Sequence, residues 1–277
     1  MKIAYSGIEG SFASIAAEKI FPGETFVPCK NFKEAYEIVE SGECDAAVLP
    51  IENSFAGEVG QVTDLMYEGS LYVNGVYPLR VSQNLLGGKG SKLSDIKKVI
   101  SHPQALEQCL EYLDAHDIET EQATNTARAA LAVAQKGDKS VGAIASKKTA
   151  SLYDLEVIEQ DINKDNMNTT RFAVLSKSIE PLHPSAEYST CIMMFTVKNE
   201  AGALAKSLEI IGRHGYNMRV IRSRRLKNVQ WQYYFYTELE GKISSIEGTA
   251  MVLEMTKYCD ILKVLGSYSV DEATIEE

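Results

Sequence analysis

The chain alternates between short apolar runs rich in β-branched residues and longer stretches whose apolar positions recur every three to four residues. The runs predict strands and the longer stretches predict helices. Their alternation up to residue 178 is typical of an α/β domain with a largely parallel sheet. The expected strands and extended segments span residues 2–7, 26–30, 44–53, 70–88, 97–102, 118–123, 141–146, 155–162 and 169–177. The expected helices span residues 11–21, 31–43, 59–69, 103–117, 125–138 and 147–154.

This α/β pattern occurs twice, around residues 1–78 and 83–160, with an extended crossing between the two. The repetition predicts two lobes with a cleft, and the last strand, Thr170–Leu175, is expected to return to the first lobe. We therefore expect lobe one to hold residues 1–78 plus 161–178 and lobe two to hold residues 79–160. Ligands of such sheets bind at the carboxyl ends of strands and the amino ends of helices.

The pattern changes after residues 179–187, a proline-containing segment that we interpret as a linker. Over residues 188–270 the expected order is strand, helix, strand, strand, helix, strand, which is the order of an α+β ferredoxin-like unit. The exposed edges of so small a sheet are often covered by a second copy of the chain. We therefore expect a homodimer or tetramer.

Composition excludes several classes of function. The 28 Lys and Arg residues against 38 Asp and Glu residues give a net charge of −10, which disfavours nucleic-acid binding, although Arg219 to Arg225 form a local basic cluster. Uncharged stretches are too short for a membrane helix and the first residues lack the apolar core of a signal peptide, so we expect a cytoplasmic protein that does not bind a membrane. The 5 cysteines and 4 histidines are scattered, which indicates neither a disulfide framework nor a metal site.

Small polar side chains stand where four predicted strands give way to the next helix or loop. They are Ser6–Ser11, Glu52–Ser54, Ser101–Gln104 and Asn125–Thr126. Such residues are the preferred helix N-caps, and we interpret His102 as the start of its helix rather than as a base. Helix amino ends also bind anions, so several of them converging on one cleft would make a carboxylate site.

The run Asn166–Leu175 places Asn168, Thr169, Thr170 and Arg171 on a loop that leads into an apolar strand. One interpretation is a strand start with an exposed arginine. The other makes Arg171 a bidentate clamp for a carboxylate and a threonine hydroxyl a hydrogen-bond donor to a reacting oxygen.

Five motifs together resemble prephenate dehydratase with its C-terminal regulatory ACT domain, over residues 1–270. They are PIENS (50–54), SHPQALEQC (101–109), NTTRFAVL (168–175), GALAKSL (202–208) and LKVLGSY (262–268). The resemblance implies a catalytic domain similar to type II periplasmic binding proteins, no cofactor, and conversion of prephenate to phenylpyruvate, water and carbon dioxide in phenylalanine synthesis. The nearest alternative is an arogenate or dual-substrate dehydratase, and a different class is a non-catalytic amino-acid sensor.

The resemblance also implies roles for single residues. Thr170 is placed at the departing hydroxyl group as a hydrogen-bond donor, and Arg171 pairs with a substrate carboxylate or orients the loop. Neutral donors suit a decarboxylation, because a fixed cation would stabilise the carboxylate that must be lost. The expected catalytic residues are Asn53, Ser54, Thr170 and Arg171. The expected substrate-binding residues are Ser11, Glu52, Gln104, Asn125, Thr126, Thr169 and Phe172, with positioning or anchoring as the alternative for Glu52 and packing for Phe172.

Two stretches of the regulatory domain depart from the family pattern. The family's P-G-A-L reads Ala201-Gly202-Ala203-Leu204 here, and its E-S-R-P reads Arg222-Ser223-Arg224-Arg225. In the family these stretches meet across a dimer interface and enclose L-phenylalanine. An arginine at 222 would repel the ammonium group of that effector, so we hypothesise weakened or altered control by phenylalanine. The alternative is an arginine that turns to solvent.

Overall fold

The computed structural model describes residues 1–164, 168–179, 190–227, 229–269 and 275. These residues form two compact units, and each unit includes segments that are distant in the sequence. Unit 1 holds residues 1–60, 77–172 and those from 273, and unit 2 holds residues 61–76 and 173–272. The predicted linker lies outside the described residues from 180 onward, and the domain boundaries drawn from the sequence stay predictions.

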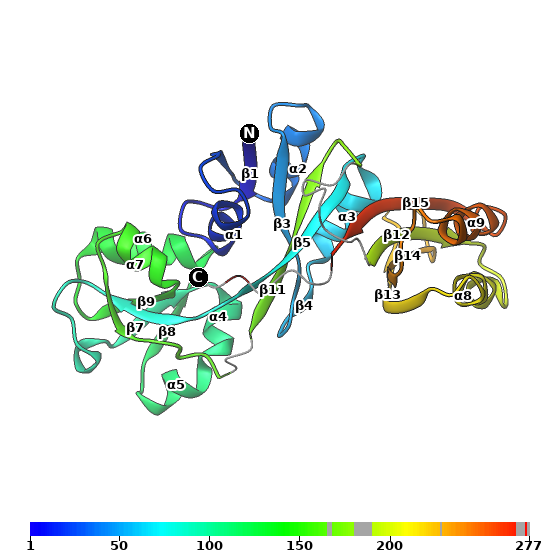
Figure 1. The fold of residues 1–277 in the computed structure, drawn as a ribbon. Coiled ribbons are helices and arrows are strands. Elements are labelled where there is room, and N and C mark those ends of the chain that lie inside the picture. Colours follow the sequence, from blue (N-terminus) through cyan, green and yellow to red (C-terminus); the bar gives the residue numbers. More distant parts are fainter. Residues whose placement is uncertain (165–167, 180–189, 228, 270–274, 276–277) are drawn as a thin grey trace. The chain divides into compact units, whose positions relative to one another are not determined.

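Lobe one of unit 1 is a mainly parallel sheet with helices packed against it (Figure 1). The strand order is β11-β3-β1-β2, and β1 pairs in parallel with both β2 and β3. Its elements are β1 (Lys2–Ser6), α1 (Phe12–Ile20), β2 (Thr25–Cys29), α2 (Phe32–Glu40), β3 (Ala46–Asn53), β4 (Gly57–Glu58) and the start of β11 (Thr169–Ser176). Strand β11 lies beside β3, and its first four residues, up to Phe172, belong to unit 1.

Lobe two of unit 1 is a five-stranded sheet in the order β10-β6-β9-β7-β8. Its strands are β6 (Asn84–Gly87), β7 (Lys98–Ser101), β8 (Glu119–Gln122), β9 (Val141–Ala145) and β10 (Glu156–Glu159). Its helices are η1 (Leu93–Asp95), α4 (Pro103–Gln108), α5 (Leu110–Ala115), α6 (Thr126–Lys136) and α7 (Lys147–Leu152). The single helix expected over 103–117 is two helices, because the Cys109 N–H bonds to the Leu106 carbonyl, three residues back, and leaves the α-helical pattern.

Two crossing segments join the lobes, and they are hydrogen-bonded to each other. The Val81 N–H donates to the Asn168 carbonyl at 2.8 Å, and the Gln83 N–H donates to the Asn163 side chain at 3.0 Å. A second contact between the lobes joins α7 to the loop after β1, where Thr149 Oγ1 donates to the Gly10 carbonyl at 2.9 Å. The two lobes of unit 1 are therefore joined at two places. One is the loop after β1, which contacts α7, and the other is the pair of crossing segments.

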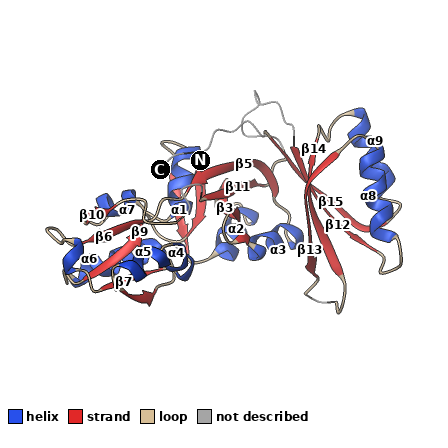
Figure 2. Cartoon of the chain, turned by 90° about the horizontal axis from the view of Figure 1, so that it is seen from below, coloured by secondary structure: helices blue, strands red, loops and turns tan. Residues whose placement is uncertain are grey.

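Unit 2 has a sheet in the order β13-β14-β12-β15-β5, with α8 and α9 side by side on one face (Figure 2). Beyond residue 189 the element order is the predicted β-α-β-β-α-β. The elements are β12 (Thr190–Val197), α8 (Ala203–Arg213), β13 (Asn217–Arg225), β14 (Tyr233–Glu240), α9 (Ile246–Met255) and β15 (Cys259–Tyr268), with α3 (Gly60–Glu68) and β5 (Tyr72–Arg80) from earlier in the chain. Strand β15 meets β5 at Gly266, where φ is +138° and an added Cβ would lie 2.2 Å from the Val73 carbonyl oxygen. A side chain therefore does not fit at this position.

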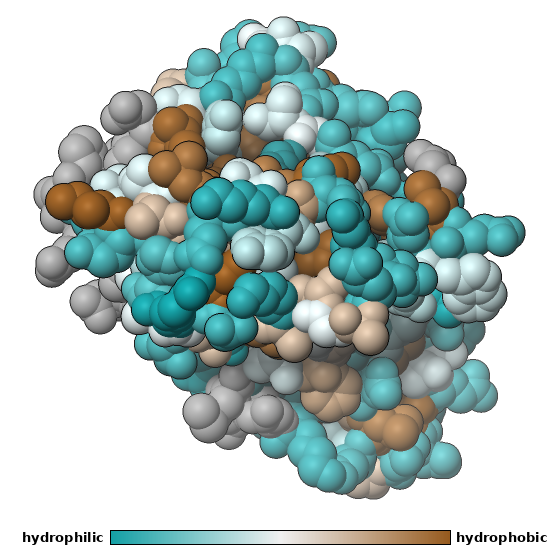
Figure 3. All heavy atoms as spheres, turned by 90° about the vertical axis from the view of Figure 1, so that its right-hand side faces the viewer, coloured by the Kyte–Doolittle hydropathy of each residue, from teal (hydrophilic) through white to brown (hydrophobic). Residues whose placement is uncertain are grey.

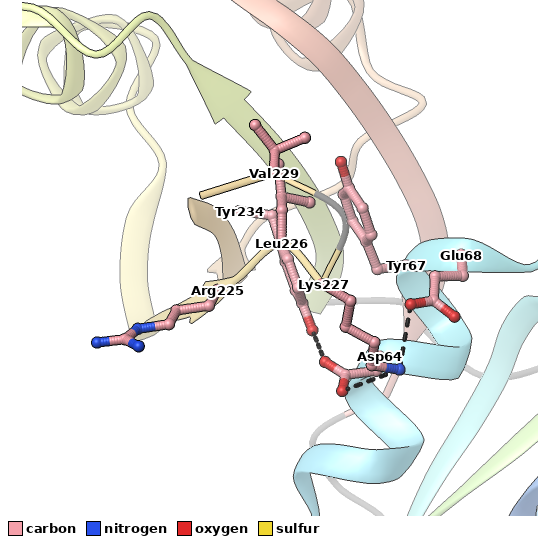
Figure 4. Close-up of a pocket in the computed structure, with 8 residues that line it drawn as sticks. All are labelled: Asp64, Tyr67, Glu68, Arg225, Leu226, Lys227, Val229 and Tyr234. Atoms are coloured by element: carbon pink, nitrogen blue, oxygen red, sulfur yellow. Dashed lines mark hydrogen bonds and ion pairs between the residues drawn. The ribbon is translucent and has the colours of Figure 1, made fainter. Parts of the chain in front are cut away.

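A buried charged group joins α3 to β13 and β14 within unit 2 (Figure 4). Asp64 Oδ1 accepts hydrogen bonds from Arg224 Nε at 2.8 Å and from the Tyr234 hydroxyl at 2.6 Å. The rings of Tyr67 and Tyr234 stack with centroids 4.2 Å apart. Lys227 reaches the same carboxylate, with Nζ 3.4 Å from Asp64 Oδ2.

The face shown in Figure 3 is mostly hydrophilic, with separate hydrophobic patches. Unit 2 exposes several large apolar side chains. Trp231, Ile246 and Leu253 are the most exposed of its large apolar side chains in the part that the structure describes, at 67%, 85% and 62%. Among the described helices, none has the length and apolar character needed to span a membrane.

Candidate active site

The candidate site forms where β3 ends and β11 begins, two neighbouring strands of lobe one. Asn53 is the last residue of β3, and Thr170 is the second residue of β11. Asn53 is 7% exposed, and its Nδ2 donates a hydrogen bond to Thr170 Oγ1 at 3.0 Å. The two candidate catalytic residues, 117 positions apart in the chain, are therefore in direct contact.

The orientation of the Asn53 amide is fixed by its surroundings. Its Oδ1 accepts from the backbone N–H groups of Phe55 and Ala56, each at 3.0 Å, which is the turn that an Asn side chain makes with its own following residues. Gln104 Nε2, from α4 in lobe two, donates to the same oxygen at 3.1 Å. The amide nitrogen must then face Thr170, because a reversed amide would point its hydrogens at three donors.

Ser54 and Thr169 bind each other's backbone and hold the two strand ends in register. The Ser54 N–H donates to the Thr169 carbonyl at 2.8 Å, and the Thr169 N–H donates to Ser54 Oγ at 3.0 Å. These two predicted site residues thus position the segment that carries Thr170.

Arg171 and Glu52 form an ion pair beside this group. Arg171 Nη1 lies 2.8 Å from Glu52 Oε2, and each side chain is 24% exposed. The pair supports the loop-orienting role for Arg171 and the anchoring role for Glu52. It also offsets the repulsion that a lone Glu52 would exert on an anionic substrate.

The remaining predicted site residues of unit 1 lie at helix starts or in the core. Ser11 accepts from the Ser14 N–H and Asn125 from the Arg128 N–H, so both cap helices, and Thr126 is the first residue of α6. Ser11 and Asn125 both approach Gly7, where an added Cβ would lie 3.0 Å from Ser11 Oγ and 3.9 Å from Asn125 Nδ2. Phe172 is 2% exposed. Ser11 and Asn125 therefore cap their helices, and the first loop of lobe one approaches the start of α6 in lobe two.

His102 is the N-cap of α4, as expected, and its Nδ1 accepts from the Gln104 N–H at 3.3 Å. Burial lowers the pKa of His102. A neutral imidazole that is occupied by capping suits a structural role better than that of a base.

Three further amide side chains belong to this site, and the sequence interpretation did not assign them a role. Asn53 Nδ2 donates to Asn168 Oδ1 at 2.8 Å, and Asn168 Nδ2 donates in turn to Gln108 Oε1 at 3.0 Å. Gln83 Nε2 donates to the same oxygen at 3.2 Å. Asn168 lies in the motif NTTRFAVL and Gln108 in the motif SHPQALEQC, so the sequence could have pointed to both as site residues. Gln83 lies outside them.

The predicted effector residues of unit 2 lie on two elements. Ala201 to Leu204 form the turn into α8, with Gly202 as its N-cap at φ +85°. Arg222 lies on β13 with its guanidinium 5.9 Å from the centre of the Tyr236 ring, and it is half-buried. Arg224, on the same strand, pairs with Asp64 as described above.

Chemically the group around Thr170 is a set of neutral hydrogen-bond donors and acceptors with one ion pair at its margin. Thr170 Oγ1 accepts from Asn53, so the hydroxyl proton is directed away from that amide and can be donated to a bound ligand. Within the described part of the chain, no three His, Cys, Asp or Glu side chains are placed to hold a metal ion.

Comparison with known proteins settles the family. The sequence profile of prephenate dehydratase matches residues 3–180. The chain belongs to the prephenate dehydratase family. Its activity is accordingly that of a hydro-lyase acting on prephenate, and its fold is that of a prephenate dehydratase, a two-lobed α/β domain with a smaller ACT-like domain.

Relatives of this dehydratase cover nearly its whole length. An arogenate dehydratase/prephenate dehydratase of Arabidopsis thaliana is 34% identical over 98% of this chain and 73% of its own. The crystal structure of a prephenate dehydratase from Arthrobacter aurescens in complex with L-Phe is 26% identical, with a TM-score of 0.89 over 99% of this chain and 92% of the other. A structure described as GqqA, a novel type of quorum quenching acylase, is 30% identical, with a TM-score of 0.88 over 97% and 98% of the two chains.

Proposed function

We propose that the chain converts prephenate to phenylpyruvate, carbon dioxide and water at the group around Asn53 and Thr170. The observation that carries this assignment is the hydrogen bond from Asn53 Nδ2 to Thr170 Oγ1 at 3.0 Å. It leaves a single, directed hydroxyl proton at the position where the resemblance places the departing hydroxyl group.

The reaction needs little from the protein besides orientation, because aromatisation of the ring drives it. The bond between the ring and its carboxylate breaks, and its electron pair enters the ring as carbon dioxide leaves. The C–O bond at the opposite ring position breaks, and the departing hydroxide takes up one proton to become water. Thr170 stabilises the developing charge on that oxygen as a hydrogen-bond donor, while water or a relay supplies the proton, because a threonine hydroxyl is too weak an acid.

The surrounding groups suit this charge distribution. The described side chains next to Thr170 are neutral, since Asn53 donates to Thr170 and Gln104 donates to Asn53, and neutral groups do not stabilise the ring carboxylate against loss. Arg171 is the nearest cation in the motif, and Glu52 balances its charge, so we place it at the side-chain carboxylate of the substrate or behind the loop.

The test is turnover of prephenate by the purified protein, followed as phenylpyruvate. Thr170→Ala should lower kcat by about 10²-fold to 10³-fold with little change in KM, as for loss of one preorganised donor to a developing oxyanion. Thr170→Ser, which keeps the hydroxyl, should recover most of the loss. Thr237→Ala is the matched control, because that buried threonine donates only to the Met193 carbonyl in unit 2. An equal loss of kcat in the control, or none in Thr170→Ala, would contradict the assignment.

Arogenate, in which an amino group replaces the keto group of the prephenate side chain, is the competing substrate. The Arabidopsis relative carries both activities in its name. The same assay with arogenate decides between them, because the ratio of kcat/KM for the two substrates measures the preference directly.

We also propose that unit 2 binds L-phenylalanine as an effector, because the related Arthrobacter enzyme is a complex with L-Phe. The homodimer or tetramer is a separate proposal, which rests on the small sheet of this unit. Arg222 lies over Tyr236 instead of extending into solvent, so its charge stays near the sheet and should weaken binding of an ammonium group. Calorimetry should show tighter phenylalanine binding by Arg222→Glu than by the unchanged chain. Equal affinities would remove the role given to Arg222.

A further inference from the structure

We propose that Asn168 is a positioning residue for this reaction: it takes one N–H of the Asn53 amide, so that the other is donated to Thr170. The inference rests on the proposed function and extends it to a residue that does not touch the reacting hydroxyl. It depends on three contacts of the Asn53 nitrogen and two of Asn168.

The first step is the count of hydrogens on the Asn53 amide. Nδ2 carries two, and it lies 2.8 Å from Asn168 Oδ1, 3.0 Å from Thr170 Oγ1 and 3.3 Å from the Thr169 carbonyl oxygen. The shortest contact, to Asn168, occupies one hydrogen. The other is then left for Thr170, with the Thr169 carbonyl as a weaker competitor. Without Asn168 the hydrogen that it holds would have the Thr169 carbonyl as its remaining acceptor. The amide nitrogen would shift toward that carbonyl and weaken its hydrogen bond to Thr170, while the donors to Oδ1 still hold the oxygen.

The second step is the orientation of Asn168 itself. Its Nδ2 donates to Gln108 Oε1 at 3.0 Å, and Gln83 Nε2 donates to the same oxygen at 3.2 Å. Gln108 therefore presents an acceptor to Asn168. The Asn168 amide must donate from its nitrogen to Gln108, which turns its oxygen toward Asn53. The Asn168 carbonyl accepts from the Val81 N–H at 2.8 Å, which fixes its backbone on the crossing between the lobes.

The third step is burial, which makes this orientation persistent. Asn168 is 2% exposed, Gln108 is 6% exposed and Gln83 is 3% exposed. Water has little access to replace a lost partner, so a reversed amide would bury two acceptors facing each other. The hydrogen bonds thus run from Asn53 to Asn168 and from Asn168 to Gln108. At the Asn53 end, this series leaves the second amide hydrogen for Thr170.

A purely structural role for the buried amides predicts lower stability when Asn168 is replaced, and so does the positioning role. The two differ in kinetics. A positioning residue that acts through Asn53 changes kcat only while Asn53 is present, and it leaves KM alone, because the affected bond matters chiefly in the transition state.

The experiment measures kcat, KM and the thermal midpoint for the unchanged chain, Asn168→Ala, Asn53→Ala and the double variant, with prephenate as substrate. We expect Asn168→Ala to lower kcat about tenfold, which equals about 1.4 kcal/mol, with KM within about twofold. In the Asn53→Ala background the same change should lower kcat less than about twofold. Asn168→Leu fills the volume, keeps water out and should reproduce the loss, so the test survives if the alanine variant does not fold.

Asn84→Ala is the matched control. Asn84 is fully buried in the same unit and its Nδ2 donates to the carbonyls of Ala145 and Ser82 at 3.2 and 3.3 Å. It should lower the thermal midpoint without changing kcat measured below that midpoint.

Three results would overturn the positioning role: kcat unchanged in both Asn168 variants, an undiminished loss in the Asn53→Ala background, or a loss carried by KM. Absence of prephenate turnover by the unchanged chain would instead overturn the proposed function, so the two failures are distinguishable.

Discussion

Replacing Asp64 removes the centre of the charged group that joins α3 to β13 and β14. Asp64 is 9% exposed and accepts from Arg224 Nε and the Tyr234 hydroxyl at one oxygen and from Arg224 Nη2, at 3.2 Å, at the other. Losing one partner of a buried ion pair costs about 3–5 kcal/mol. The Arg224 side chain is 26% exposed, so solvent screens part of its charge and we expect about 3 kcal/mol for Asp64→Ala.

The pH dependence of this contribution has a definite sign. Burial raises the pKa of Asp64, but the hydrogen bonds from Arg224 and Tyr234 and the nearby positive charges outweigh it, so the pKa lies below the ordinary value of 3.8. A carboxyl group with a lowered pKa in the folded state stabilises the fold above its unfolded pKa and loses that contribution as pH falls through its folded pKa. The stability difference between the unchanged chain and Asp64→Asn should therefore be full at neutral pH and shrink below pH 3.8.

The assay is urea unfolding followed by tryptophan fluorescence. Trp231 is the single tryptophan of the chain and lies in unit 2, so its signal reports on the unit that holds Asp64. Glu68→Gln is the control from the same helix, because Glu68 is 50% exposed and pairs with Lys227 at the surface, where ion pairs contribute little. Equal costs for Asp64→Ala and Glu68→Gln would refute burial as the source of the stabilisation. An Asp64→Asn difference that persists at low pH would refute the ionised carboxylate as its source.

Two further predictions concern backbone geometry and thiol chemistry. Gly266→Ala should lower the free energy of unfolding by about 3 kcal/mol in the same urea assay, because φ is +138° and the new Cβ would meet the Val73 carbonyl oxygen; an unchanged midpoint would contradict this close approach. Burial raises the pKa of Cys109 and of Cys191 to about 12, so both thiols should stay unmodified by a disulfide reagent at pH 8 until the protein is denatured, as measured by mass spectrometry of the native and unfolded chains. Rapid labelling of either cysteine in the native protein would show that its strand or helix opens.

The order of strands and helices was predictable because each element carries its own period and its own terminators. The element order of the last domain follows from that local information, whereas the pairing of β11 with β3 is a long-range contact. The break between α4 and α5 was not predictable, because the pattern of apolar residues is continuous there and the break depends on the hydrogen bond of the Cys109 N–H. Periodicity does not distinguish one helix from two with the same buried face.

Part of the candidate site was predictable as a set of residues, but its hydrogen bonds and the roles of Asn168, Gln108 and Gln83 were not. PIENS and NTTRF identify Asn53 and Thr170, while the hydrogen bond between them depends on β3 and β11 being neighbours. The ion pair of Arg171 with Glu52 and the pairing of Arg224 with Asp64 are long-range contacts that no local pattern contains. Arg224 was predicted as an effector residue, and its contact with α3 appears only in the structure.

The crossing between the lobes ends at Asn168, two residues before Thr170, and Gln104 reaches Asn53 from the other lobe at 3.1 Å. The candidate site therefore stands where the two lobes meet, and one of its hydrogen bonds joins them. Selection among substrates then has a mechanical component. We therefore expect the site to discriminate against molecules that keep Gln104 apart from Asn53.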